Sequence, residues 1–448
     1  MKAKKKVILI LFILIISLFI SKNVDISKQK NISVNTTKHK IMDREKLSKS
    51  LIIREVDFSH FEKIKVNIVD DYGAIANDNK DDWKAIQSAL NRVKNNGGGT
   101  VIIPNGTFEL NHSLKIYKNT RLSLSKDTIV NRNHRGALMI NGDVGATYRG
   151  YNGNGNILVE GGTYLMNKSS DEALPGGWFG IARAKGIIIR NTVVKNLQDS
   201  HAIDLNSSQN VLIDNVKFLG YRDSTEDHSK DYIEAIQIAN HTQKGFMAFG
   251  EFDGKHTEKV TVQNCTFSTS DTDGFTNWPV GVGNHGYGIL KEYNKDIKIR
   301  LNHFNNMTMA GIHFNAYQNV IIEGNEFINN QRGVSMETPV RNYTRDALIM
   351  TELQAGQDIT ISDNTFRNTK MENVIISGYQ NESEVAEIKN IKIVDNYFIG
   401  RQEDKGKGYT NIRISLVNNM VMKNNLLINI DNNVDVVQSI SVTIENNR

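Results

Sequence analysis

The stretch Ile-Lys-Ile-Arg-Leu-Asn-His-Phe at residues 297–304 returns at residues 320–327 as Val-Ile-Ile-Glu-Gly-Asn-Glu-Phe. Both copies have apolar residues at the first and third positions, asparagine at the sixth and phenylalanine at the eighth. Alternating apolar residues are typical of a strand with one buried face. The asparagine fits a tight turn, because its side chain tolerates left-handed backbone and can bond to the asparagine of the next coil. The pattern therefore predicts stacked coils of strand and turn.

This pattern runs through most of the chain. Further copies begin at Ile187, Val211, Val260 and Ile359, and weaker ones begin at Ile391, Met420 and Val442. The starts at 187 and 211, at 297 and 320, and at 420 and 442 lie 24, 23 and 22 residues apart, which we interpret as one bare coil. Longer steps carry loops. No helical period lies between the strands, which excludes leucine-rich repeats and helical solenoids. The chain is therefore predicted to be an all-β, single-stranded parallel β-solenoid.

A different pattern precedes the repeats, in DYGA at residues 71–74, DDWKAIQSAL at 81–90 and GGGTVIIPNG at 97–106. Asp81 or Asp82 can begin a helix, and residues 95–99 end it. Its apolar face at helical spacing consists of Trp83, Ile86, Leu90 and Val93. This segment, about residues 67–110, resembles the opening of the pectate-lyase superfamily, the pectin-lyase-like proteins. The resemblance implies a right-handed parallel β-helix with an N-terminal capping helix, and a carbohydrate substrate.

Composition excludes some function classes. The net charge of +5 includes Lys2, Lys4, Lys5 and Lys6, and without them 50 basic side chains face 49 acidic ones. A nucleic-acid partner is therefore not expected, because such proteins carry a strong basic excess. The single cysteine, Cys265, excludes an internal disulfide, and we interpret it as a core residue.

The N-terminus has the pattern of an export signal. Positive residues 2–6 precede an apolar run from Val7 to Ile20, which is shorter than the ~20 residues of a membrane span. We expect a signal peptide or signal anchor at residues 1–21, a polar linker at 22–65 and the β-helix domain at 66–448. The protein would be secreted or anchored at the outer face of the cell membrane, would contact the membrane only through the N-terminal segment if that segment is not cleaved, and would be a monomer.

Aligned coils predict one polar face. Five coils share a second strand of the form x-small-apolar-polar, at residues 201–204, 234–237, 273–276, 310–313 and 332–335. Alternation points the last residue of each outward in one column, namely Asp204, Gln237, Thr276, His313 and Ser335. A parallel column at the strand entrance contains His201, Glu234, Asp273 and Arg332. Outward residues are polar by default, but clustered titratable groups are also what acid–base chemistry requires.

Two insertions flank these strands, at residues 221–256 and 278–295, and could wall a groove. Their neighbourhood supplies further candidate substrate-binding residues: His201, Gln237, Trp178, Trp278, His285 and Tyr287. The three aromatic side chains are of the kind that stack on sugars, although they could equally anchor the loops. A calcium ion near Asp271 and Asp273 is conceivable, but no specific ligand spacing is present, so the cofactor stays unknown.

Two mechanisms fit a polysaccharide substrate. In a lyase, His313 would be the base and Arg332 would stabilise the uronate carboxylate. In a hydrolase, Asp204, Glu234 and Asp273 would supply the acid and the base. The order of acidic, histidine and basic residues is similar to that of β-helix polygalacturonases, but their Asn-x-Asp, Asp-Asp, Gly-His-Gly and Arg-x-Lys motifs are absent as such.

From these features we expect an extracellular enzyme that cleaves an acidic, uronate-containing polysaccharide by β-elimination. The alternatives are an inverting hydrolase of the polygalacturonase type, a C5-epimerase, and a non-catalytic polysaccharide-binding or adhesin β-helix.

Overall fold

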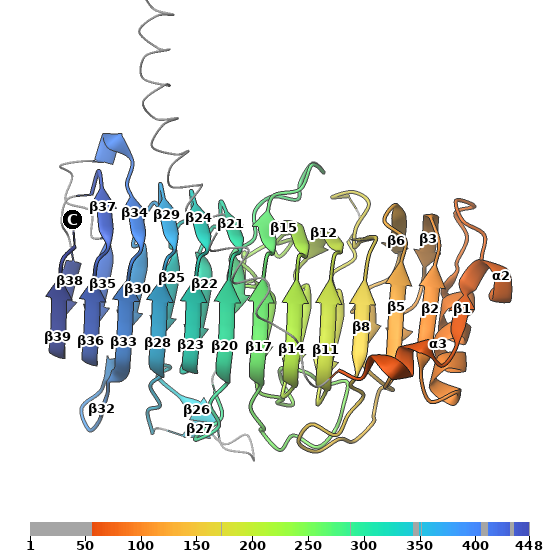
Figure 1. Ribbon diagram of the computed structural model, residues 1–448, viewed down its shortest axis with the longest axis horizontal. Coiled ribbons are helices and arrows are strands. Elements are labelled where there is room, and N and C mark those ends of the chain that lie inside the picture. Colours follow the sequence, from red (N-terminus) through yellow and green to blue (C-terminus); the bar gives the residue numbers. More distant parts are fainter. Residues whose placement is uncertain are drawn as a thin grey trace, which may run out of the picture. The chain divides into compact units, whose positions relative to one another are not determined.

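The computed structural model describes residues 56–171, 173–286, 288–343, 349–350, 352–404, 411–430 and 434–447. Within these ranges three long sheets of parallel strands enclose a common interior. The coils follow one another in chain order along the sheets, from residue 65 to residue 445 (Figure 1). The predicted parallel β-helix is confirmed. Each regular coil contributes one strand to each sheet, which we name sheets A, B and C.

Sheet A carries the alternating apolar residues that begin each repeat. Its strands are, in spatial order, β1 (Lys65–Asn67), β2 (Gly99–Ile103), β5 (Thr120–Leu124), β8 (Ile157–Glu160), β11 (Lys185–Arg190), β14 (Gln209–Asp214), β17 (Glu258–Gln263), β20 (Lys295–Arg300), β23 (Gln318–Glu323), β28 (Gln357–Ser362), β33 (Ile388–Val394), β36 (Val417–Lys423) and β39 (Ile440–Glu445). Residues equivalent in the repeat are paired, as Val260 is with Ile297 and Ile297 is with Val320.

Sheet B carries the large apolar residue that ends each repeat. Its strands are β3 (Gly106–Leu110), β6 (Thr128–Arg132), β9 (Thr163–Leu165), β12 (Val193–Gln198), β15 (Lys217–Arg222), β18 (Thr266–Ser268), β21 (His303–Asn305), β24 (Glu326–Ile328), β29 (Thr365–Arg367), β34 (Tyr397–Ile399) and β37 (Leu426–Ile428). Many of these strands have three residues and one inward side chain, so they give no period-two signal and were not predicted as a separate sheet.

Sheet C carries the polar column expected from the sequence. Its strands are β4 (Leu114–Lys115), β7 (Met139–Ile140), β10 (Phe179–Ala182), β13 (Ile203–Asn206), β16 (Glu234–Ala239), β19 (Val280–Gly283), β22 (Ala310–Asn315), β25 (Val334–Glu337), β30 (Val374–Ser377), β35 (Ile412–Ser415) and β38 (Val434–Val437). Loops between the coils contain two antiparallel hairpins, β26 (Asn342–Tyr343) with β27 (Ile349–Met350) and β31 (Tyr379–Gln380) with β32 (Val385–Ala386), and the short helix η2 (Gln402–Asp404).

The interior is held by stacked identical side chains. Phenylalanines of successive coils lie parallel, with ring centroids 4.8 Å apart for Phe267 and Phe304 and 4.9 Å apart for Phe304 and Phe327. Buried asparagines form the predicted ladder: the Asn325 side chain donates to Asn364 Oδ1 at 2.9 Å. The left-handed backbone lies at the residue before each ladder asparagine, as at Leu301 (φ 56°) before Asn302. The turn and the ladder therefore use different residues.

The N-terminal end is closed by helix α3 (Trp83–Asn95), as predicted, with Ile86, Leu90 and Val93 fully buried. Asp82 is its N-cap residue, but the carboxylate of Asp81 accepts the Trp83 amide at 3.1 Å. In the part of the chain described from residue 56 on, two further helices precede it, η1 (Phe58–Glu62) and α2 (Ile68–Tyr72).

The folded body begins earlier than the expected boundary at residue 66. Val56 and Phe61 are buried against Leu158, Ile188 and Leu212 of sheet A. No helix in the described ranges is long and apolar enough to cross a membrane, and the Val7–Ile20 run lies outside them.

Candidate functional site

Four of the five predicted column residues are aligned on sheet C. Asp204 pairs with Gln237, Gln237 with Gly283, Gly283 with His313, and His313 with Ser335. Because neighbouring strands lie about 4.8 Å apart, this register brings Asp204 to His313 within four coils. The geometric basis of the candidate site is therefore present.

The third coil was predicted in the wrong register. Its strand on sheet C is β19, whereas Thr276 makes an isolated antiparallel bridge with Tyr221, and both Asp273 and Thr276 are exposed outside the sheet. The pattern at residues 273–276 matched by chance because a long loop precedes the true strand. Gly283 takes the column position instead, and a Cβ atom there would lie 1.5 Å from the His313 carbonyl oxygen. The column therefore has no side chain at this position, because the His313 backbone fills the place that a Cβ atom would take.

Glu234, the first residue of β16, lies at the centre of a histidine cluster. Its side chain is fully buried, and its Oε2 lies 2.8 Å from His285 Nδ1 and 3.5 Å from His201 Nδ1. The two imidazole rings stack with centroids 5.4 Å apart and planes at 18°. Glu234 Oε1 has no hydrogen-bond partner in the described part of the chain. We name His201, Glu234 and His285 the His–Glu cluster.

Two residues that the sequence did not single out support the site: one contacts the His–Glu cluster and the other contacts Asp204. Tyr232 packs on His285 with ring centroids 4.4 Å apart, and Asn206 donates to Asp204 Oδ1 at 2.7 Å. Each lies two residues from a predicted site residue, Tyr232 before Glu234 and Asn206 after Asp204. Same-face spacing along β13 could have indicated Asn206, whereas Tyr232 precedes β16 and has no such signal.

Asp204 and His313 have opposite pKa shifts with one common cause. Burial raises the pKa of the Asp204 carboxyl, although the charge of nearby His201 and the hydrogen bond from Asn206 oppose this. Burial lowers the pKa of His313, although the carboxylates of Glu337 and Glu234 oppose this. Desolvation disfavours the charged form of either group. Asp204 thus keeps its proton to higher pH than usual, and His313 stays neutral to lower pH, which suits an acid and a base.

Arg332 lies near this face, but its charge already has a partner. Its Nε donates to Glu372 Oε2 at 2.9 Å, and Arg413 Nη1 lies 3.1 Å from the other oxygen of the same carboxylate. Glu372 is buried between them. The neutralising role expected for Arg332 would therefore require Glu372 to share this arginine with a substrate carboxylate.

The aromatic candidates occupy other places than expected. Trp178 and Trp278 are fully buried and pack on Tyr164 and Tyr221, with ring centroids 4.9 Å and 5.0 Å apart. Neither is exposed for stacking on a sugar, so the alternative, anchoring by packing, describes them. Tyr287 lies outside the described residues. Asp271, considered for calcium, is exposed and pairs with Lys195.

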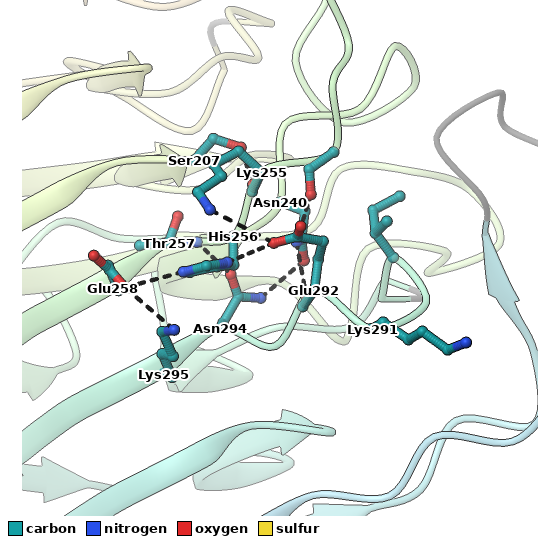
Figure 2. A network of polar contacts seen from close by, with 12 residues as sticks. Ser207, Asn240, Lys255, His256, Thr257, Glu258, Lys291, Glu292, Asn294 and Lys295 are labelled. Atoms are coloured by element: carbon teal, nitrogen blue, oxygen red, sulfur yellow. Dashed lines mark hydrogen bonds and ion pairs between the residues drawn. The ribbon is translucent and has the colours of Figure 1, made fainter. Parts of the chain in front are cut away.

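The loop that carries His285 is held by a polar network at its far end (Figure 2). His256 lies between two carboxylates, with Nδ1 2.6 Å from Glu292 Oε2 and Nε2 3.0 Å from Glu258 Oε2. Asn294 donates to Asn240 Oδ1 at 3.1 Å. These contacts join the loop after β16 to Glu292 and Asn294, at the far end of the loop after β19.

The family follows from a model described as "Right handed beta helix region", which matches residues 175–338 and 255–398, together half of the chain. The chain belongs to the right-handed β-helix family. It is 34% identical over 289 residues to plasmin and fibronectin-binding protein A (PfbA) of Streptococcus pneumoniae, which is 60% of this chain and 40% of that protein. The crystal structure of PfbA, described as a surface adhesin, matches with a TM-score of 0.74 and 25% identity, over 86% of this chain and 91% of that one.

Two enzymes also match this right-handed β-helix. An iota-carrageenase of Alteromonas macleodii is 34% identical over 80 residues, 16% of each chain. A family 28 exopolygalacturonase of Yersinia enterocolitica has a TM-score of 0.56 at 15% identity, over 86% of this chain and 76% of that one. The latter likeness concerns the fold alone and agrees with the expected pectin-lyase-like superfamily. The chain spans less than half the length of both proteins matched by sequence.

Proposed function

We propose that this chain is a cell-surface β-helix protein that binds an extended polysaccharide on sheet C, across the coils that carry Asp204, Gln237 and His313. The observation that carries the proposal is the His–Glu cluster, a buried carboxylate beside the partly exposed His285, with one oxygen that has no partner among the residues the structure describes. Buried polar atoms are normally satisfied, so such an atom supports a binding role. Stacked coils also repeat polar groups at regular spacing along a chain-like ligand.

The likeness to PfbA supports the surface location and the binding role. PfbA is described as a surface adhesin, and its solved part covers most of the same β-helix. A protein that only binds its glycan needs no proton transfer, and would keep its ligand unchanged.

A second candidate function, cleavage of the bound glycan, is favoured by the opposite pKa shifts of Asp204 and His313. In a hydrolase, protonated Asp204 would donate to the leaving oxygen, and the Glu234 carboxylate would activate water. In a lyase, neutral His313 would remove the proton at C5 of a uronate. Hydrolysis is the better supported of the two, because the Glu372 carboxylate already binds Arg332, the cation that elimination would use.

One experiment separates these functions. The purified protein is incubated with a panel of uronate-containing, sulfated and neutral glycans, and binding, reducing ends and the absorbance of unsaturated products are followed together. Binding alone indicates an adhesin, new ends without absorbance indicate a hydrolase, and both signals indicate a lyase. An absence of binding across the panel contradicts the proposal.

Glu234→Gln is the test variant for this site. Glu326→Gln is its matched control, because Glu326 also pairs with a histidine, His303, at 3.0 Å but on sheet B. We expect Glu234→Gln to weaken glycan binding and to abolish any cleavage, and Glu326→Gln to leave both unchanged. Equal behaviour of the two variants would place the glycan elsewhere.

A further inference from the structure

We propose that the His–Glu cluster binds a divalent transition-metal ion of the zinc class through His201, Glu234 and His285. One ligand atom from each residue lies within 4.8 Å of the others. Zinc bonds of about 2.0–2.2 Å place tetrahedral ligand atoms about 3.4 Å apart. The His285 side chain, on the loop after β19, is partly exposed and is the one of the three with the most room to adjust to a metal.

The unpaired Glu234 oxygen is an independent indication of a ligand. The side chain is fully buried, and Oε1 finds no donor among the residues that the structure describes. A proton on this oxygen would itself need an acceptor. A metal ion would satisfy the oxygen and balance the buried charge at once.

The two histidines lie in positions that suit a metal. Their rings stack, and the Nδ1 atoms lie 2.8 Å (His285) and 3.5 Å (His201) from the same Glu234 oxygen. The backbone oxygen of Glu234 lies 2.9 Å from His201 Nδ1 and fixes the orientation of that ring, as outer contacts do for metal-bound histidines.

The donor set selects the metal. Two imidazoles and one carboxylate are preferred by Zn²⁺ and its neighbours, whereas Ca²⁺ takes six to eight oxygen ligands. Three protein ligands leave a fourth position, which a water molecule or an oxygen of an anionic glycan can take. The biological role of this metal, holding an anionic glycan, rests on the proposed function. Metal binding itself can be measured without a glycan.

The test uses the full chain after removal of metals with a chelator, titrated with Co²⁺ as a spectroscopic probe and then with Zn²⁺ in competition. We expect one equivalent of Co²⁺ to produce visible absorption bands that Zn²⁺ removes. His285→Ala should weaken binding by about 10-fold or more, while His303→Ala, which disrupts the His–Glu pair on sheet B, should change nothing.

Two results would overturn the metal site: no stoichiometric Co²⁺ binding, or equal affinity in His285→Ala and in the unaltered protein. Because His285 is partly exposed, its substitution tests the site even if substitution of the buried Glu234 prevents folding. Metal binding without binding of any glycan would contradict the proposed function alone, and glycan binding without metal binding would contradict this inference alone.

Discussion

A comparison of two buried glutamates tests whether the His–Glu cluster serves function rather than stability. Glu372 has both oxygens paired, with Arg332 at 2.9 Å and Arg413 at 3.1 Å. Glu234 has one oxygen paired with His285 at 2.8 Å, and the other has no partner in the described ranges. Substitution of each by glutamine keeps the shape and removes the charge.

The expected magnitudes differ. Glu372→Gln loses at least one charge-assisted hydrogen bond, which contributes about 1.5–3 kcal/mol to the free energy of unfolding. Glu234→Gln keeps an oxygen that accepts from His285. It removes a buried charge that two histidines, at 2.8 Å and 3.5 Å, compensate less well than two arginines compensate Glu372. The loss of about 1 kcal/mol in hydrogen-bond strength is therefore offset by the lower cost of burial. We expect this variant to lie within about 1 kcal/mol of the unaltered protein.

The assay is the urea midpoint at neutral pH in the presence of a chelator, with the slope of the transition as a check that the unfolded states are alike. If Glu234→Gln leaves the midpoint almost unchanged and Glu372→Gln lowers it, the cluster is a site selected for function at the expense of stability. Equal destabilisation of Glu234→Gln and Glu372→Gln would instead show that the cluster is an ordinary structural ion pair.

Three further outcomes are expected. Burial raises the pKa of Asp204 above its unfolded value of about 3.9, so the contribution of Asp204 to the free energy of unfolding is favourable below that value and is lost as pH rises through the folded pKa. Asp204→Asn should therefore raise the urea midpoint at pH 7 and change it little near pH 3.5. An equal effect at both pH values would contradict this. Asn364→Ala removes the rung that accepts from Asn325 and donates to Asn396, which should cost about 3 kcal/mol or more in unfolding free energy; an unchanged midpoint would show that the ladder contributes nothing. Phe304→Ala opens the interior stack and should cost about 3–5 kcal/mol, measured by the same urea transition, whereas a loss below 1 kcal/mol would mean that neighbouring rings refill the gap.

The fold could be predicted from the sequence because its main signal repeats. Every coil places apolar residues at the same offsets, and the interior requires this of each strand of sheet A. Helix α3 was equally clear, since Trp83, Ile86 and Leu90 follow helical spacing. Sheet B was missed because a three-residue strand with one inward residue has no period to detect.

The site was predicted in part for the same reason. Asp204, Gln237 and His313 lie within regular strands, so their alignment could be predicted by counting residues from the repeat. The register of the third coil depends on a loop of irregular length, which counting cannot predict. The pattern at residues 273–276 therefore indicated a strand that in fact lies at β19. The burial of Trp178 and Trp278 depends on partners in neighbouring coils, Tyr164 and Tyr221, which no local pattern reveals.

Hydrogen–deuterium exchange of the intact protein, with and without a glycan that it binds, tests directly whether the glycan binds on sheet C. We expect slower exchange in segments 203–206, 234–239, 280–283 and 310–315, which are adjacent strands of sheet C. Slower exchange confined to sheet A or sheet B would contradict this expectation and would place the binding surface on another side of the β-helix.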